Sequence, residues 1–214
     1  MISLILDCSC GMSIYLVCGE KVFSRIDSTQ NKHSDELLVM VDDLLKEANL
    51  NVNQIDNLCV CIGPGSFTGV RVAISLVKGL AIGTNAKVFT LSNFDVFDVE
   101  LDDSTCLVLD GFSSFVYIRR VIDGKKVEEC VDVSQLKNEI DKNNLKVYVL
   151  SEKTQNILKR FEIIANISQN NIVDAFCSVV ENSQAVALNQ IFPVYLRASQ
   201  AEIEREKKLK NGSN

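Results

Sequence analysis

A glycine-rich turn at residues 63–71, GPGSFTGVR, is the stretch whose composition most directly suggests chemistry. It joins the apolar run 58–62 to an apolar helical pattern, which indicates a strand, a turn and a helix N-terminus. Gly63 and Gly65 allow backbone conformations closed to other residues, and Ser66 can cap the helix. Exposed N–H groups at a helix start attract phosphate, although the Lys-Ser/Thr pair of a Walker loop is missing here. An ordinary strand-to-helix turn is favoured, and a phosphate cradle is the alternative.

Two aspartates follow two similar apolar strands. Residues 4–7 read LILD and residues 107–110 read LVLD, which places Asp7 and Asp110 at equivalent strand ends. A carboxylate in this position commonly caps the turn after a strand, and the Asp-Gly pair that starts at Asp110 suits that role. A turn is therefore the favoured interpretation, and a ligand-binding role is the alternative.

Cysteines offer a possible metal site. The chain has eight, spread without an export signal, so we expect reduced thiols. Cys8 with Cys10, and Cys59 with Cys61, are spaced so that each pair lies on one face of a strand. Four thiolates could bind zinc if the two strands were neighbours. Zinc sites usually use Cys-x₂-Cys in loops, however, and buried cysteines commonly fill apolar cores, so packing is favoured and no metal is expected.

Histidine chemistry is limited because His33 is the single histidine of the chain. Any Ser-His-Asp or Cys-His arrangement would have to use it, and no Gly-x-Ser-x-Gly elbow is present. A structural role for His33 at a helix entrance is favoured over a general base or ligand. The sequence predicts no catalytic residue.

Hydrophobic periodicity predicts the same order of elements in both halves of the chain. The first half gives strands at 2–8, 13–18 and 21–26, a helix at 34–48, a strand at 58–62 and a helix at 66–82. The second half gives strands at 105–109, 115–122 and 126–132, a helix at 134–142, a strand at 146–150 and a helix at 152–160. Two βββαβα units predict an α/β fold of two lobes with mixed sheets that face each other across a cleft. We expect an N-terminal lobe at 1–100, a C-terminal lobe at 101–200 and a charged tail at 201–214.

Both helices of the first half carry more apolar surface than one sheet contact requires. The first has the stripe Leu37, Val41, Leu44 and Leu45. The second is apolar almost all round, with Phe67, Val70, Ile74 and Val77 on one side, Val72, Leu76 and Leu80 on another, and a narrow polar ridge of Arg71, Ser75 and Lys78. Two apolar faces indicate either deep burial or a protein interface.

Composition indicates a compact cytoplasmic protein. Apolar residues make up 47% of 214 residues, and the net charge is −6. An acidic chain without a basic block before its C-terminus is a poor candidate for holding nucleic acid on its own surface. The apolar run 1–8 is too short for a signal peptide and lacks a leading positive charge, and no window approaches a membrane span.

The chain resembles the TsaB (YeaZ) family of accessory subunits in bacterial synthesis of threonylcarbamoyladenosine in tRNA. The segments that carry the resemblance are 5–9, 33–38, 63–69 and 78–81, and beyond residue 100 it thins to 107–110 and 193–197. The resemblance implies the actin-like and Hsp70-like ATPase (ASKHA) fold. It also implies a noncatalytic subunit that pairs with itself when alone, binds and activates TsaD, works with the pathway ATPase TsaE, and meets tRNA only through the complex.

The family resemblance also implies roles for particular residues. A partner interface is expected to involve Leu37, Val41, Leu44, Leu45, Gly63, Gly65, Phe67, Gly69, Val70, Ile74 and Val77. A remnant nucleotide cleft is expected at Asp7, Ser9 and Asp110. In TsaD an HxxxH pair supplies two metal ligands, and Leu37 stands here at the second position, so no metal or other cofactor is expected, with ATP binding by the complex left open. The alternatives are an ATPase or small-molecule kinase of the same superfamily, and a homodimeric scaffold without a tRNA role.

Overall fold

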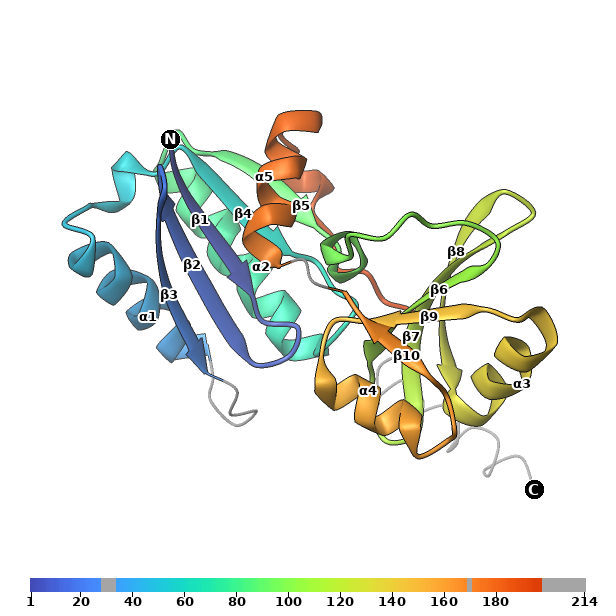
Figure 1. Cartoon of the computed structure of the whole chain (residues 1–214). Helices are drawn as coiled ribbons and strands as arrows, with labels where there is room; N and C mark the ends of the chain where they lie inside the picture. The colour runs from blue at the N-terminus through green and yellow to red at the C-terminus, as the bar shows by residue number, and fades with distance from the viewer. Residues whose placement is uncertain (28–33, 169–170, 198–214) are drawn as a thin grey trace, which may run out of the picture.

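The computed structural model describes residues 1–27, 34–168 and 171–197 (Figure 1). The expectation for His33 and the expected charged tail at 201–214 lie outside the described residues. Within the described ranges, none of the helices has both the length and the apolar character needed to cross a membrane.

The first sheet has five strands in the order β3-β2-β1-β4-β5. Its strands are β1 (Ile2–Asp7), β2 (Met12–Cys18), β3 (Lys21–Asp27), β4 (Asn57–Cys61) and β5 (Lys87–Leu91). The first three form an antiparallel meander, and β4 and β5 continue the sheet in parallel with β1. Helices α1 (Ser34–Glu47) and α2 (Phe67–Gly83) make the crossovers that parallel strands require.

The second sheet repeats this arrangement in the order β10-β9-β6-β7-β8. Its elements are β6 (Thr105–Asp110), β7 (Phe115–Ile122), β8 (Lys125–Asp132), α3 (Val133–Asn143), β9 (Lys146–Val149), α4 (Glu152–Lys159) and β10 (Ala165–Ile167). Both βββαβα units and the two mixed sheets are therefore confirmed. The fifth strands β5 and β10 were not predicted, and β10 has only 3 residues.

Helix α5 (Ile172–Asn182) is the main element that periodicity missed. It packs on the first sheet, where Phe176 and Ala175 join Ile5, Cys59 and Phe89 in one apolar cluster. The opposite face of the same sheet is covered by α1 and α2 (Figure 1). Because β1 and β4 are buried on both faces, residues 4–6 of β1 and 58–61 of β4 are continuously apolar rather than alternating.

The two lobes meet through the chain that follows β5. The short helix η2 (Asn93–Val96) is part of this linker. Phe94 and Phe97 pack against Leu107 and Leu109 of the second sheet. We keep residue 100 as the proposed boundary between the lobes, but α5 and residues 186–191 after it pack on the first lobe.

The glycine turn brings the start of α2 into direct contact with the loop between β1 and β2. A Cβ atom at Gly69 would lie 2.0 Å from the carbonyl oxygen of Cys8, and one at Gly65 would lie 2.6 Å from Cβ of Ser9. Ser66 N–H donates to the Ser9 carbonyl at 2.8 Å. Glycine is therefore required at these two positions because a side chain would push two backbones apart.

We expect Gly69→Ala to lower the free energy of unfolding by about 2–3 kcal/mol, the upper part of the range for overpacking, because backbone cannot yield as a flexible side chain can. Gly79→Ala in the same helix is the control, since its new Cβ would have no heavy atom within 4 Å. It should raise stability by about 0.5–1 kcal/mol through helix propensity. Urea denaturation measures both, and equal effects of the two changes would contradict the account.

Candidate functional site: a groove between two helices and a cleft between two lobes

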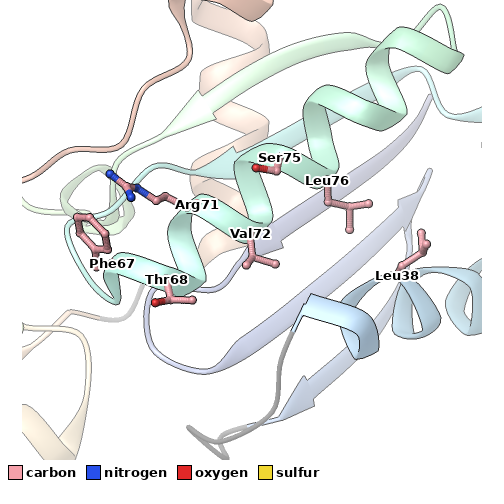
Figure 2. Close-up of a pocket in the computed structure, with 7 residues that line it drawn as sticks. All are labelled: Leu38, Phe67, Thr68, Arg71, Val72, Ser75 and Leu76. Carbon is pink, nitrogen blue, oxygen red and sulfur yellow. The ribbon is translucent and has the colours of Figure 1, made fainter.

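An apolar groove of about 470 Å³ runs between α1 and α2. It is lined by Leu38, Phe67, Thr68, Arg71, Val72, Ser75 and Leu76. Figure 2 shows Leu38 on α1, and Val72 and Leu76 on α2, pointing into the space between the helices. The side chain of Leu38 is 53% exposed, and Val72 and Leu76 are half-buried.

The side chains expected at a partner interface need correction. Seven of them are buried against the chain's own first sheet: Leu37, Val41, Leu44, Leu45, Val70, Ile74 and Val77. They form the inner stripe of each helix, which the sheet requires. The second apolar face of α2 exists, but Val72 and Leu76 carry it, together with Leu38 from α1.

The remaining interface candidates surround the start of α2. Gly63 is buried and has a φ of +98°, a conformation that favours glycine, while Gly65 and Gly69 are the close-contact positions described above. Phe67 is 37% exposed, and it lines both the groove and a second, larger cavity. Phe67 is therefore the one side chain of the expected interface that is accessible in the free chain.

The larger cavity is a cleft of about 1050 Å³ between the lobes. Asp7, Ser9 and Asp110, for which the family resemblance implies a shared cleft, all line this cavity. Ser9 N–H donates to Oδ1 of Asp7 at 2.8 Å, which is the turn-capping role. Burial raises the pKa of the Asp7 carboxyl above its ordinary value of 3.8, against the smaller opposing effect of the Ser9 hydrogen bonds.

Lys153 is a cleft residue that sequence reasoning missed. Its Nζ forms an ion pair with Oδ2 of Asp110, and this contact raises the pKa of the Lys153 ammonium. Lys153 lies in the first turn of α4. The sheet order brings this turn beside the end of β6, and no local sequence pattern indicates that proximity. The ammonium gives Asp110 a positive partner from within the chain.

The start of α2 has the hydrogen bonds of an ordinary strand-to-helix turn. Ser66 Oγ accepts from Gly69 N–H at 3.2 Å, and the Ser66 carbonyl accepts from Val70 N–H at 3.0 Å. Since Ser66 N–H is also paired with the Ser9 carbonyl, the chain itself occupies these donors.

The four cysteines of the two Cys-x-Cys pairs do not converge. Cys59 and Cys61 lie in the cluster under α5, Cys8 lies in the cluster under α1 and α2, and Cys10 is exposed. Burial raises the pKa of Cys8 to about 12, which opposes the thiolate that zinc requires. Among the residues that the structure describes, no group of three or more His, Cys, Asp or Glu side chains is arranged to hold a metal ion.

Comparison with known proteins gives the relationship of the chain. Residues 18–205 match the family model described as TsaD: tRNA N6-adenosine threonylcarbamoyltransferase. A tRNA threonylcarbamoyladenosine biosynthesis protein TsaB from Haemophilus influenzae is 33% identical over 122 residues, which are 55% of this chain and 51% of that protein. The chain belongs to the TsaB (YeaZ) family. The TsaB protein of Buchnera aphidicola subsp. Acyrthosiphon pisum is 22% identical over 77% of this chain and 72% of its own length.

Solved structures agree with the fold of this TsaB-family chain. YeaZ from Pseudomonas aeruginosa superposes with a TM-score of 0.67 at 22% identity, over 91% of this chain and 99% of that chain. A second Pseudomonas aeruginosa structure, described as an uncharacterized protein with similarity to peptidase YEAZ, gives a TM-score of 0.68 at 22% identity, over 92% and 99% of the two chains. The alignment to the Haemophilus influenzae TsaB spans about half of that protein's length, 51%.

The raised pKa of Asp7 predicts that ionisation of this carboxyl lowers the stability of the folded chain. Stability should fall as the pH rises above 3.8, because the folded state keeps the proton that the unfolded state has lost. Asp7→Asn should therefore raise the melting temperature at pH 7, and the gain should shrink as the pH falls toward 3.8.

Asp102→Asn is the control with the opposite sign. Hydrogen bonds from Thr105 and Ser104 lower the pKa of Asp102 below 3.8, so its stabilising effect is present above that pH and is lost on acidification. This variant should melt lower than wild type at pH 7. Thermal melts from pH 3 to pH 8 would contradict the account if the two variants shifted in the same direction.

Proposed function

We propose that this protein is a noncatalytic subunit of the tRNA N6-threonylcarbamoyladenosine transferase complex, and that it binds and activates TsaD. The observation that carries the proposal is the apolar groove between α1 and α2. Its apolar side chains remain at least partly exposed in the free chain after both helices have packed on the first sheet. The names of the TsaB relatives support the pathway. The TsaD family match over residues 18–205 supports a partner of similar architecture.

The groove has the chemistry of a helix-docking surface. Leu38, Val72 and Leu76 supply an apolar floor, while Arg71 and Ser75 supply a polar rim. An amphipathic helix pair from a related fold would bury such a floor. We therefore propose that TsaD binds here with its equivalent helices, and that a second copy of this chain takes the same place when TsaD is absent.

Two features support a noncatalytic role. Leu37, at the position of the second metal-binding histidine of TsaD, is fully buried in the first lobe's core, so this position offers no ligand. In the cleft, Lys153 forms an ion pair with Asp110, which would compete with a divalent cation for that carboxylate. Transfer of threonylcarbamoyl to tRNA is accordingly assigned to TsaD in the cytoplasm, with the pathway ATPase TsaE as a further partner and tRNA met only through the complex.

The cleft itself favours one alternative, an ATPase or small-molecule kinase. Its volume of about 1050 Å³ and the presence of Asp7 and Asp110 in one wall are suited to a nucleotide. Isothermal titration with Mg-ATP separates the two functions. Tight binding with turnover by this chain alone would favour the alternative.

Purified alone with the threonylcarbamoyl-adenylate donor and tRNA, the protein should modify no adenosine. Adding TsaD and the pathway ATPase should restore modification, and leaving this chain out of that mixture should abolish it. Mass spectrometry of nucleosides from the digested tRNA measures the product. Modification by this chain alone would overturn the noncatalytic role.

Leu38→Asp and Val72→Asp should each weaken TsaD binding more than about a hundredfold, because an unpaired carboxylate in a desolvated interface costs about 3 kcal/mol or more. Both positions are at least partly exposed in the free chain, so a cooperative melt should persist. Titration calorimetry measures binding, and calorimetric melts measure folding.

Ile164→Asp is the matched control, since Ile164 is 90% exposed on the second lobe and should tolerate the charge with no loss of binding. Val77→Asp, at a fully buried position of α2, should instead unfold the lobe. Normal TsaD binding by folded Leu38→Asp and Val72→Asp variants would place the partner surface elsewhere.

A further inference from the structure

The segment 191–197, here called the strap, returns along the first lobe after α5. Ile191 is buried in the core of the first lobe, and its carbonyl accepts from Nζ of Lys78 at 3.0 Å. Val194 N–H then donates to the carbonyl of Ile62, the residue that follows β4, at 2.8 Å. The first part of the strap is therefore fixed to the same lobe that carries the groove.

The middle of the strap is held by a three-member stack at the start of α2. The Tyr195 ring lies 4.9 Å from the Phe67 ring at an interplanar angle of 27°. Nε of Arg71 donates to the Tyr195 hydroxyl at 2.5 Å, and the Arg71 guanidinium lies 3.8 Å from the centre of the Phe67 ring. One arginine thus fixes two aromatic side chains from distant parts of the chain.

The end of the strap belongs to the second lobe. Leu196 packs with Leu107, Leu109 and Tyr117 of the second sheet. The Arg197 guanidinium lies 3.8 Å from the centre of the Phe112 ring, which stacks on Phe115 at 5.3 Å. The contacts therefore change from one lobe to the other between Tyr195 and Leu196.

The strap also joins the two cavities. Arg71 lines the groove, Phe67 lines both the groove and the cleft, and Tyr195 and Arg197 line the cleft. A partner helix in the groove would touch Arg71, whose guanidinium already holds Tyr195. Any movement of Arg71 on binding would pass to the strap and from there to Phe112 of the second lobe.

We propose that Arg71 is a positioning residue that couples partner binding in the groove, through the strap, to the arrangement of the second lobe around the cleft. This inference rests on the proposed function, because it takes TsaD as the occupant of the groove. Coupling of this kind is reciprocal: if TsaD binding shifts the second lobe, a molecule that fixes the cleft changes the affinity for TsaD.

Amide hydrogen exchange at residues 109–117 of the second lobe, measured by mass spectrometry, tests the coupling in the free chain. Arg71→Lys keeps the charge but loses the planar stack, and Tyr195→Ala removes the ring. Each should speed exchange at 109–117 about tenfold, the change that follows from losing an aromatic or cation–π contact of about 1.4 kcal/mol. Phe192→Ala is the control, because Phe192 is in the strap and 66% exposed, and its ring lies beside Lys78 of the first lobe.

The same measurement with TsaD present tests the partner's part. In the wild type, TsaD should change exchange at 109–117 as well as over α1 and α2. Tyr195 does not line the groove. The Tyr195→Ala variant should therefore bind TsaD with an affinity within about threefold of wild type, and TsaD should protect its amides from exchange over α1 and α2 alone.

The outcomes separate the two proposals. Unchanged exchange at 109–117 in both free variants overturns the strap's link to the second lobe. Wild-type protein that binds TsaD without any change at 109–117 overturns the coupling while leaving the proposed function intact. Failure of the wild type to bind TsaD contradicts the proposed function and, with it, the partner's part of the inference.

Discussion

The close contact between the start of α2 and the loop after β1 is the constraint on which the rest of the structure depends. Gly65 and Gly69 allow two backbones to approach where any side chain would collide, and Ser66 bonds to the Ser9 carbonyl across the contact. This contact sets how α2 lies on the first sheet. Val70 and Val77 then face the core, while Val72 and Leu76 face the groove beside α1. It also places Phe67 between the groove and the cleft, so the two cavities share one wall.

The cleft between the lobes holds two strand-end aspartates that already have partners within the chain. Asp7 and Asp110 stand at equivalent strand ends, as expected for two repeated lobes. Asp7 is held by the Ser9 turn, and burial favours its neutral form. Asp110 has a lysine partner from α4. Two carboxylates that are satisfied within the chain are poor ligands for the metal ion of a metal–nucleotide complex, which agrees with the proposed role as a binding subunit.

Local patterns allowed much of the fold to be predicted from sequence, because each βββαβα unit has clear periods and turn signals. The repeated sequences LILD and LVLD aligned the first strands of the two lobes with each other. Periodicity could not show where α5 packs. The helix covers one face of the first sheet, and its position depends on that tertiary contact rather than on a local pattern. Periodicity also could not say which apolar stripe of α2 faces inward, and the expected interface residues were mostly those of the core.

The strap contacts were also beyond reach of the sequence. Arg71 and Lys78 were interpreted as part of a polar ridge on α2, whereas Arg71 bonds to Tyr195 and Lys78 bonds to Ile191, each more than a hundred positions away.

The central claim is that the groove between α1 and α2 is the surface that TsaD covers. Methyl NMR of the labelled chain, titrated with unlabelled TsaD, tests it most directly, because Leu38, Val72 and Leu76 each carry methyl groups at the groove. The account predicts that these three residues show the largest changes in chemical shift, while the methyl groups of Ile164 and Ile167 on the second lobe's edge remain unchanged. Unchanged signals from Leu38, Val72 and Leu76 at saturating TsaD, with changes elsewhere, would contradict it.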